Sequence, residues 1–402
     1  MLETTERGRE YHERVSAFME ELVYPNERVY DEQMRAAGNP HHQPQILEDL
    51  KAEAKKRGLW NLFHPHPEWG PGLTNLEYAP LAELMGRSPR IAPEAFNCNA
   101  PDTGNMEVFT LFGTEEHKEK YLNPLLDGTM ASGFAMTEPA VASADATNIE
   151  LSMKRDGDGY RLNGRKWFTS NGMHPYLGVL IVMGKTDPEA EVHRQQSMMV
   201  VPVGAEGLTI LRNLSVFGYE DREGHAEVVF DNVYVPAKDV LKGEGEGFAI
   251  SQARLGPGRI HHCMRAIGMA ERALELMCER AESRVLFGSK LSEKANIQDW
   301  IAESRTEIDM ARLLTLHAAD MMDKVGNKEA RTLISEIKIA APKVALKVID
   351  RAIQVHGGGG VTGDFPLAEM YAHARTLRIV DGPDEVHKRG IARAELKKYR
   401  KR

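Results

Sequence analysis

Residues 354–385 read QVHGGGGVTGDFPLAEMYAHARTLRIVDGPDE. Four consecutive glycines, Gly357–Gly360, leave the backbone free to adopt positive φ and to approach another molecule closely. Asp381 is followed directly by Gly382, an order that favours a carboxylate on a tight, uncrowded turn. A small-molecule site requires this combination, because bare backbone can bind a ligand and one exposed acid can act in chemistry. Each piece alone is more often a solvated turn, so the interpretation depends on the longer pattern.

Length, charge and cysteine content limit the class of protein. A chain of 402 residues is expected to form two or three domains. A net charge of −8 argues against binding to nucleic acid or to an anionic membrane surface. The three cysteines, Cys98, Cys263 and Cys278, match neither a disulfide framework nor a metal-binding pattern, which favours a reducing compartment.

Other kinds of site are disfavoured by the motifs that the sequence lacks. No apolar run reaches membrane-spanning length and no secretory signal precedes residue 20, so we expect a cytoplasmic protein without membrane insertion. His64 and His66 have no third ligand nearby, and we predict no metal site. Without GxGxxG at a strand–helix junction and without a P-loop, Rossmann-type cofactor binding and ATP hydrolysis are disfavoured.

Hydrophobic periodicity changes twice along the chain. Residues 1–130 show helical spacing, with one helix expected to stop before Pro25 and another to be capped by Thr114. Residues 131–245 show short alternating segments, in which Asn163-Gly164 is interpreted as a hairpin turn. Long helices are predicted after that, over residues 260–284, 293–325 and 329–356, followed by shorter helices over 365–377 and 384–397. The predicted fold class is α+β.

The stretch 354–385 resembles the C-terminal signature of the acyl-CoA dehydrogenases, which has a Gln, a Gly-Gly pair, an aromatic-Pro pair and a carboxylate-Gly. The resemblance implies an N-terminal α-helical domain (1–130), a middle β-barrel domain (131–245) and a C-terminal four-helix-bundle domain (246–402). In that fold FAD lies between the middle domain and the bundle. Asp381 stands where the family has a glutamate base, and Pro383 stands where it has a threonine.

The same resemblance implies roles for the residues of this signature. Asp381 would be the catalytic base, and Gly382 would bind the substrate. The residues expected to bind the cofactor are Gln354, Gly357, Gly358, Pro383 and Glu385.

Two motifs in the middle of the chain resemble the flavin-binding elements of the family. In FAMTEP, residues 134–139, the resemblance implies that Phe134, Met136 and Thr137 contact FAD, and that Ser143 lies where flavin phosphate and CoA approach each other. The isoalloxazine ring needs hydrogen-bond partners at its polar edge and apolar walls elsewhere. In NGRKWFTSNG, residues 163–172, two alignments remain open. The aromatic and hydroxyl that meet the flavin are either Phe168 with Ser170 or Trp167 with Thr169.

Two further elements imply contacts to CoA and to a second subunit. Arg259 falls at the position of the family's CoA-contacting arginine, and in GPGR it was expected to open a helix, where an anion is favoured. Arg284, Phe287 and Gln298 resemble the element that reaches the FAD of a neighbouring subunit. A homodimer or homotetramer is therefore expected.

These resemblances predict an FAD-dependent acyl-CoA dehydrogenase that removes hydrogens from the α- and β-carbons of an acyl-CoA. Residues 58–63, 70–83 and 96–108 resemble most the subgroup of acyl-CoA dehydrogenase family members 10 and 11. Electron-transfer flavoprotein is the expected electron acceptor. The alternatives are an acyl-CoA oxidase, an enzyme that processes 4-hydroxy- or 4-phospho-acyl-CoA without net oxidation, and a flavoprotein scaffold without enzymatic activity.

Overall fold

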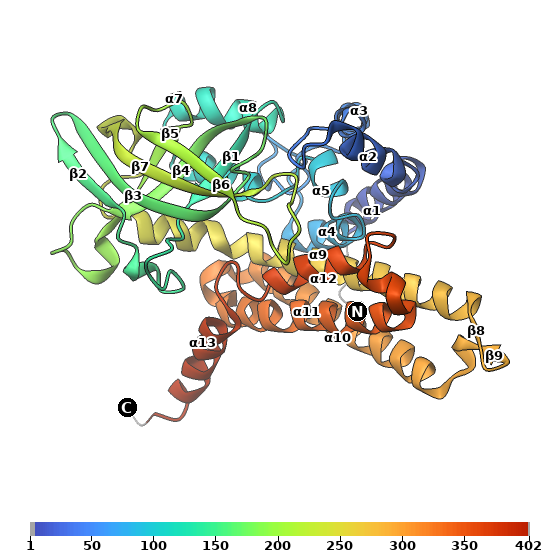
Figure 1. Cartoon of the computed structure of the whole chain (residues 1–402). Helices are drawn as coiled ribbons and strands as arrows, with labels where there is room; N and C mark the ends of the chain where they lie inside the picture. The colour runs from blue at the N-terminus through green and yellow to red at the C-terminus, as the bar shows by residue number, and fades with distance from the viewer. Residues whose placement is uncertain (1–4, 401–402) are drawn as a thin grey trace. The chain divides into compact units, whose positions relative to one another are not determined.

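The structure is a computed structural model that describes residues 5–400, except for the side chains of residues 255–257 (Figure 1). It divides into two compact units. The first contains the chain up to Pro25, Gly72–Pro93 and the chain from Gly256 onward. The second contains Asn26–Pro71 and Glu94–Leu255. Each unit is described separately.

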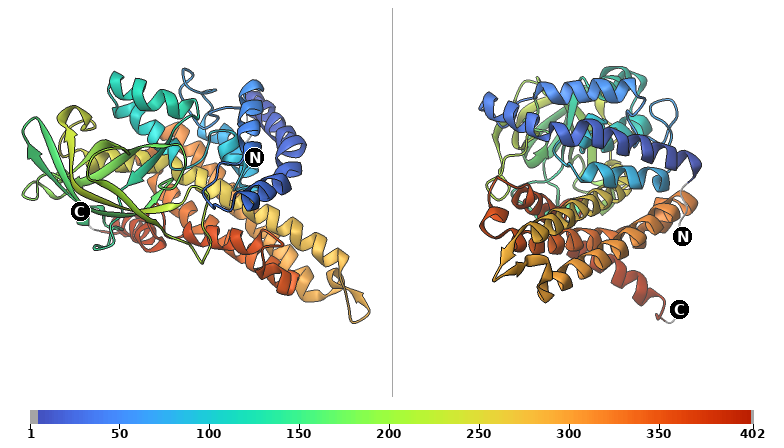
Figure 2. Two further views of the ribbon diagram at one scale, coloured as in Figure 1. Left: turned by 45° about the horizontal axis from the view of Figure 1, so that its top comes forward. Right: turned by 90° about the vertical axis from the view of Figure 1, so that its right-hand side faces the viewer.

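The first unit is built from helices. Its long members are α9 (Gly247–Ser283, which starts in the second unit), α10 (Ala295–Val325) and α11 (Asn327–His356). Only Gly326 separates α10 from α11, so these two helices turn back sharply and run side by side (Figures 1 and 2). The shorter helices are α1 (Glu6–Phe18), α4 (Asn75–Gly86), α12 (Leu367–Thr376) and α13 (Asp384–Lys397). Apolar side chains at helical spacing, such as Ile334, Ile337, Ala341 and Ala345 of α11, form the core.

Glycines let α4 and α9 cross with their backbones in contact. A Cβ on Gly268 would lie 2.0 Å from the carbonyl oxygen of Glu83, and a Cβ on Gly86 would lie 2.2 Å from that of Arg265. Backbone atoms cannot give way as the end of a side chain can. Both positions therefore require glycine for packing rather than for a special backbone conformation.

The second unit contains a sheet of seven strands. The strands are β1 (Ala131–Ala135), β2 (Ser152–Asp156), β3 (Gly159–Ser170), β4 (Leu177–Lys185), β5 (Gln196–Pro202), β6 (Leu208–Asn213) and β7 (His225–Pro236). Their order is β1-β4-β2-β3-β7-β6, and β5 pairs with β4. Strand β4 is parallel to β1 and β2, and the other neighbours are antiparallel.

Side chains from six strands meet in one core inside this sheet. Ala135 of β1, Met153 of β2, Leu162 of β3, Val182 of β4 and Met199 of β5 belong to it, as does Val228 of β7. The sheet therefore folds back on itself, as a barrel does. In the described chain no pairing joins β6 to β1 or β5, so the barrel is open.

The helices of the second unit are α2 (Tyr24–Ala37, whose first residues belong to the first unit), α3 (Gln45–Lys56), α6 (Asp102–Phe112), α7 (Glu115–His117) and α8 (Asn123–Leu126), and the four-residue α5 (Ala92–Ala95) lies at the boundary of the units. Thr114 caps α7 as predicted, because its side chain accepts a hydrogen bond from the backbone N–H of His117 at 3.2 Å. The predicted fold class, with helices, then a β-sheet and then helices along the chain, is confirmed. No helix in residues 5–400 is long and apolar enough to cross a membrane.

The predicted helix stop before Pro25 is wrong. A π-helical turn over Met19–Val23 follows α1, and the helical path continues through Pro25 into α2. In this wider turn the N–H of Tyr24 bonds to the carbonyl of Met19, five residues back. Proline lacks an N–H and clashes with a carbonyl in an ordinary helix interior, and a widened turn followed by a new first turn relieves both problems.

The predicted hairpin at Asn163-Gly164 and the predicted start of the long helix at residue 260 are also wrong. β3 runs without interruption from Gly159 to Ser170, and the register to β7 shifts at Leu162/Gly164, so the glycine marks a bulge. α9 begins at Gly247, and Arg259 consequently lies in its interior. Tertiary packing overrides the local glycine and proline signals at both places. Arg259 therefore does not stand at the start of a helix, as the sequence had predicted.

The α4–α9 crossing yields a prediction about stability. Gly268→Ala should lower the free energy of unfolding by about 1–3 kcal/mol, because the added methyl group meets the backbone of Glu83. Urea unfolding measures the change. Gly390→Ala in α13 is the matched control, since a Cβ there meets nothing within 4 Å and alanine favours a helix by about 1 kcal/mol. Equal free energies of unfolding for Gly268→Ala and Gly390→Ala would contradict the close backbone contact between α4 and α9.

Candidate active site

Asp381 lies on the turn between α12 and α13 in the left-handed backbone region, which non-glycine residues seldom adopt. Its φ is 53° and that of the following Gly382 is 95°. A non-glycine residue at positive φ is strained, and such strain gathers at functional sites. The carbonyl oxygen of Asp381 accepts from Arg259 Nε at 3.2 Å and lies 3.3 Å from His387 Nε2. The turn is thus held by α9 on one side and α13 on the other.

The side chain of Asp381 is partly buried and has a specific partner. Its Oδ2 lies 3.3 Å from Nε2 of His262, and the two side chains are 18% and 19% exposed, respectively. The carboxylate is therefore accessible from outside while one of its oxygens is held. A general base needs both properties.

Basic groups surround this carboxylate. Burial lowers the pKa of Arg259, and burial also lowers the pKa of Lys338, whose ammonium donates to the carbonyl of Leu377. Burial, with Arg259 nearby, lowers the pKa of His387 to about 4. Burial raises the pKa of the Cys263 thiol to about 12, so this cysteine is not a nucleophile. The fixed positive charges favour the ionised form of an acid at position 381.

In the second unit the motif FAMTEP begins with the last two residues of β1 and continues into the loop that follows this strand. Phe134, Met136, Thr137 and Ser143 are all partly buried. The hydroxyl of Ser143 accepts from the backbone N–H of Glu138 at 2.9 Å and closes the loop. The guanidinium carbon of Arg254 lies 4.0 Å from the centre of the Phe134 ring. This cation–π contact leaves one ring face covered by charge.

A buried ion pair anchors this loop, and the sequence analysis missed it. Lys166 Nζ donates to Glu138 Oε1 at 2.7 Å and to the carbonyl of Met136 at 2.8 Å. The Glu138 carboxylate also accepts from the backbone N–H groups of Glu150 and Leu151. Burial lowers the pKa of Lys166 to about 8 despite Glu138. The available signal was a lysine on the inward side of a strand, which calls for an acidic partner.

Strand β3 carries the residues for which two alignments were open. Phe168 is 45% exposed and has φ 49°. Ser170 Oγ lies 3.0 Å from Nδ1 of His225. Trp167 Nε1 and Thr169 Oγ1, in contrast, are buried polar atoms with no hydrogen-bond partner among the described residues. Such atoms are costly unless a ligand or water satisfies them, and they fit the polar edge of a flavin.

The remaining predicted cofactor residues lie elsewhere in the first unit. Arg284 and Phe287 lie on the small hairpin of β8 (Val285–Leu286) and β9 (Ser289–Lys290), which Figure 1 shows away from α13. The Phe287 side chain is 94% exposed. Gln298 donates to the carbonyl of Ser292 at 3.1 Å. The structure does not bring these residues to the Asp381 turn.

The glycine run is less open than predicted. Only Gly357 has positive φ, at 62°, and Gly357–Val361 form a 3₁₀ turn. A Cβ on Gly360 would lie 2.5 Å from the carbonyl of Ile353, so packing demands this glycine. Gly358 has open space around it. At the two ends of the signature, Gln354 and Glu385 are exposed, and Pro383 is half-buried.

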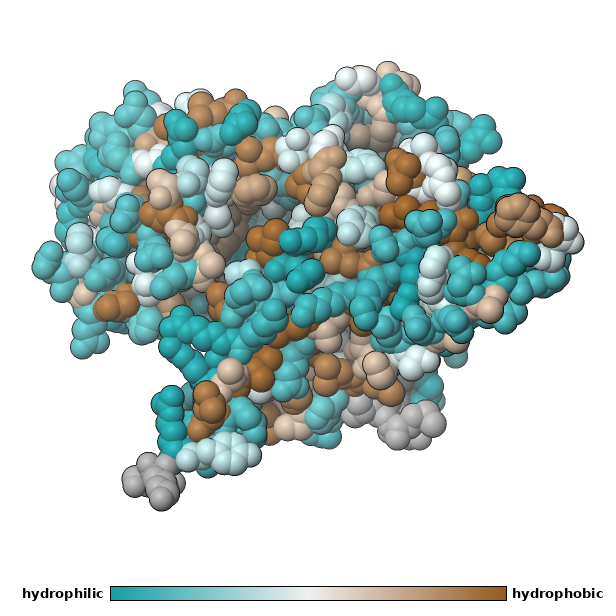
Figure 3. Space-filling view, turned by 60° about the horizontal axis from the view of Figure 1, so that its bottom comes forward, coloured by the Kyte–Doolittle hydropathy of each residue, from teal (hydrophilic) through white to brown (hydrophobic). Residues whose placement is uncertain are grey.

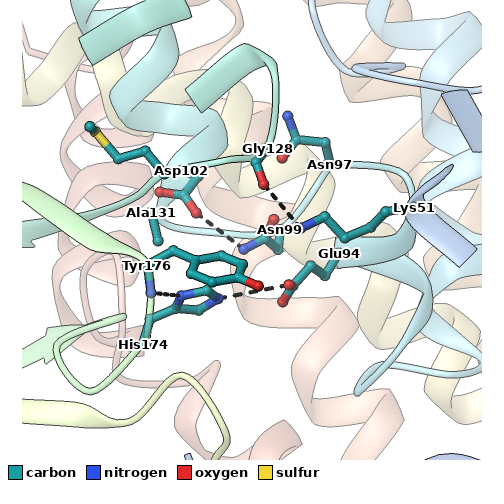
Figure 4. Close-up of a pocket in the computed structure, with 10 residues that line it drawn as sticks. Lys51, Glu94, Asn97, Asn99, Asp102, Gly128, Ala131, His174 and Tyr176 are labelled. Carbon is teal, nitrogen blue, oxygen red and sulfur yellow. Dashed lines mark hydrogen bonds and ion pairs between the residues drawn. The ribbon is translucent and has the colours of Figure 1, made fainter. Parts of the chain in front are cut away.

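A polar cavity in the second unit is too small to be a substrate site. Its lining includes Lys51, Glu94, Asp102 and His174, and Figure 4 shows their side chains facing one another. The cavity measures about 10 Å³, the space of one water molecule. Glu94 forms an ion pair there with Arg222, which is 3% exposed. We interpret this cluster as structural.

Glu107 was also missed by the sequence analysis. Burial raises the pKa of this carboxyl to about 8, although the charge of Arg254 lowers it. Glu107 lies on α6, and Arg254 is the cation above Phe134. An acid with a raised pKa beside a fixed cation is typical of functional sites. No local motif marks it.

Comparison with known proteins identifies the family. The chain matches the acyl-CoA dehydrogenase N-terminal domain over residues 5–129, the middle domain over 133–233 and the C-terminal domain over 245–396. It is 58% identical over 388 residues to the Mycobacterium tuberculosis protein named "Probable acyl-CoA dehydrogenase FadE2", covering 96% of this chain and 95% of that one. It is 51% identical to mouse acyl-CoA dehydrogenase family member 11 over 98% of this chain.

Solved structures that resemble this chain include members of the same family. One from Mycobacterium abscessus, assigned to the acyl-CoA dehydrogenases, is 49% identical with a TM-score of 0.96 and covers 99% of this chain and 100% of its own. Butyryl-CoA dehydrogenase from Megasphaera elsdenii is 26% identical with a TM-score of 0.82, covering 98% and 99%. The chain spans 51% of the length of mouse family member 11.

The chain therefore belongs to the acyl-CoA dehydrogenase family, a class of flavoprotein oxidoreductases that act on acyl-CoA. The predicted similarity to the subgroup of family members 10 and 11 is confirmed.

The environment of His387 predicts a pH dependence of stability. Its folded-state pKa of about 4 lies below the ordinary value of 6.5. The unfolded chain therefore binds a proton between these values and the folded protein does not, so stability falls as pH decreases from 6.5 to 4. His387→Gln should make this decline shallower by up to about 1.4 kcal/mol per pH unit, as measured by urea unfolding.

The exposed His42 provides the control for that measurement. His42→Gln should leave the slope unchanged. An unaltered slope in His387→Gln would show that His387 takes up its proton as readily in the folded protein as in the unfolded chain.

Proposed function

We propose that this protein is an FAD-dependent acyl-CoA dehydrogenase of fatty-acid catabolism, with Asp381 as the base that removes the α-proton of the thioester. The observation that carries the proposal is the Asp381 turn, where a partly exposed carboxylate on a strained backbone is held by Arg259, His262 and His387. Strain of this kind persists only where the surrounding structure fixes it.

Asp381 accepts the proton, and its surroundings control when it can do so. The adjacent cations keep the free carboxylate ionised and ready to accept. An α-proton is weakly acidic, so donors must stabilise the thioester oxygen as negative charge develops on it. Entry of an acyl chain removes water from the site and favours the neutral acid, which assists proton transfer to Asp381.

Residues of the second unit would hold the cofactor. The unpartnered Trp167 Nε1 and Thr169 Oγ1 support the alignment in which these two residues, rather than Phe168 and Ser170, meet the flavin. Phe134, Met136, Thr137 and Ser143 remain the predicted contacts on the loop after β1. When bound, FAD supplies the acceptor for the hydride that leaves the β-carbon.

Arg259 is assigned a different role from the one expected from sequence. It was predicted to contact CoA from the start of a helix, but it lies inside α9 and donates to the backbone of Asp381. We infer that it positions the base. A contact to CoA by the same side chain stays a prediction, as do the contacts of Gly382.

The protein is proposed to act as a homodimer or homotetramer with electron-transfer flavoprotein as electron acceptor. Helix α10 exposes Met310 by 61% and Leu313 by 56%. Figure 3 shows hydrophobic residues distributed among hydrophilic ones on the face turned toward the viewer. Where exposed apolar side chains form one contiguous patch, they favour a subunit interface. Arg284, Phe287 and Gln298 would then reach a neighbour's FAD. An acyl-CoA oxidase is the alternative, and rapid reaction of the reduced flavin with oxygen would identify it.

Asp381→Asn tests the role of the base. The variant should retain FAD and bind acyl-CoA, yet reduce its flavin at least about 10²-fold more slowly, because the amide cannot take up the α-proton. Anaerobic stopped-flow absorbance measures this rate. Asp364→Asn, at an exposed acid in the same signature, should behave as wild type. Flavin reduction at the wild-type rate in Asp381→Asn would refute the assignment.

We further propose that the substrate carries a polar group beyond the β-carbon, as 4-hydroxy- and 4-phospho-acyl-CoA do. The observation in favour is the pair Glu107 and Arg254 beside Phe134, a predicted flavin contact. Processing without net oxidation is the alternative reaction for such substrates.

A substrate panel tests this proposal. The ratio kcat/KM for a 4-hydroxy or 4-phospho acyl-CoA should exceed that for the plain chain of equal length by about tenfold or more, because polar groups left unpaired by the plain chain reduce its binding. Arg254→Met should lower this preference. Faster turnover of straight chains would make the protein an ordinary β-oxidation dehydrogenase, and product formation without flavin bleaching would indicate the non-oxidative reaction.

A further inference from the structure

His262 contacts the predicted base from the middle of α9. Its Nε2 lies 3.3 Å from Asp381 Oδ2, and about four-fifths of each side chain is buried, with 19% and 18% exposed. In a partly buried site a hydrogen bond to a carboxylate is stronger than in water, because water competes less. None of the motifs in the sequence includes this histidine.

Arg265 determines which ring nitrogen of His262 carries the proton. The Nη2 atom of Arg265 lies 3.3 Å from Nδ1 of His262. A guanidinium has only donors and keeps its charge, so Nδ1 must accept through its lone pair. The neutral ring then carries its proton on Nε2, the atom that faces Asp381. The three residues form one directed chain of hydrogen bonds that ends on the carboxylate.

The groups around these three hydrogen-bonded residues favour a neutral His262. Burial and the charges of Arg265 and Lys338 lower the pKa of His262, and the contact with Asp381 opposes that shift. The titratable and charged groups that face the pair are Arg259, His261, Cys263 and Arg265 of α9, Lys338 of α11 and His387 of α13. Among these six, the charged side chains are all cations, so a second proton on His262 would meet like charge.

An aspartate base has a particular need for such a partner. Its side chain is one methylene shorter than that of glutamate, so its reach depends on the backbone and on what holds the carboxylate. Arg259 and His387 hold the backbone carbonyl of Asp381. The contact from His262 fixes the carboxylate itself.

We propose that His262 is a positioning residue for the base, which it orients through an Nε2–H bond to Asp381 Oδ2 whose direction Arg265 sets. The inference rests on the proposed role of Asp381. The bond stabilises the ionised carboxylate before reaction. The substrate proton then passes from the α-carbon to Asp381, and His262 keeps its own proton throughout.

Two substitutions in the FAD-loaded protein separate positioning from simple packing. His262→Leu removes the donor and should slow anaerobic flavin reduction about 10- to 100-fold. It should also move the acidic limb of the pH–rate profile to higher pH, because the carboxylate loses a bond that favours its charged form. His262→Gln places an amide N–H near the position of Nε2 and should restore most of the rate and the limb.

A packing role alone gives a different result. In both variants the FAD content and the melting temperature would then decrease together. The acidic limb of the pH–rate profile would stay where it is in the wild type. An unmoved limb in His262→Leu, or no rescue by His262→Gln, overturns the inference.

A readout independent of activity checks the tautomer. Nitrogen-15 NMR spectra of histidine-labelled wild type and of His262→Gln identify the His262 signals as those that are missing from the variant. In the wild type these signals should show a protonated Nε2 and an unprotonated Nδ1. A proton on Nδ1 instead of Nε2 overturns the proposed direction of the hydrogen bonds from Arg265 through His262 to Asp381.

The Asp381→Asn variant distinguishes failure of this inference from failure of the proposed function. If Asp381→Asn reduces its flavin normally, the proposed base is wrong whatever His262 does. If Asp381→Asn is inactive while His262→Leu keeps the wild-type rate and pH profile, only the role of His262 is wrong. In the double variant, His262→Leu should add no further loss, because its effect passes through Asp381.

Discussion

One backbone carbonyl organises the candidate active site. Arg259 from α9 and His387 from α13 both bond to the oxygen of Asp381, and this fixes a residue with φ of 53° at a strain of roughly 1–3 kcal/mol. The direction of the Asp381 side chain, the proposed base, follows from that backbone, as does its contact with His262. Helices α9 and α13 of the first unit thus hold one peptide group of the candidate site, and α9 is itself packed closely against α4 at Gly268.

The sequence predicted the elements with strong periodicity and the residues within recognisable motifs. The helix over residues 384–397 has the predicted bounds, and Asp381 was singled out from its neighbour Gly382. Proline and glycine signals misled at Pro25, at Gly164 and before Arg259. A π-helical turn, a bulge and long-range packing against the helix accommodate them, and none of these follows from local propensity.

The partners of the candidate site could not be predicted because no local pattern encodes them. His262 and Asp381 meet only after α9 packs beside the turn that follows α12. Lys166 and Glu138 meet only when β3 passes the loop after β1. Sequence motifs name residues that contact a shared cofactor or substrate.

If the proposed cofactor satisfies the unpartnered atoms Trp167 Nε1 and Thr169 Oγ1, its binding couples folding to the supply of that ligand. Each buried polar atom left without a partner costs about 1–3 kcal/mol, and a bound group that satisfies it returns that free energy to the folded state. By mass action, the fraction of chains that stay folded then depends on the concentration of free ligand. A cell short of that ligand would hold less of this protein, because unfolded chains are removed by proteolysis, and its abundance would follow the supply without a dedicated regulator.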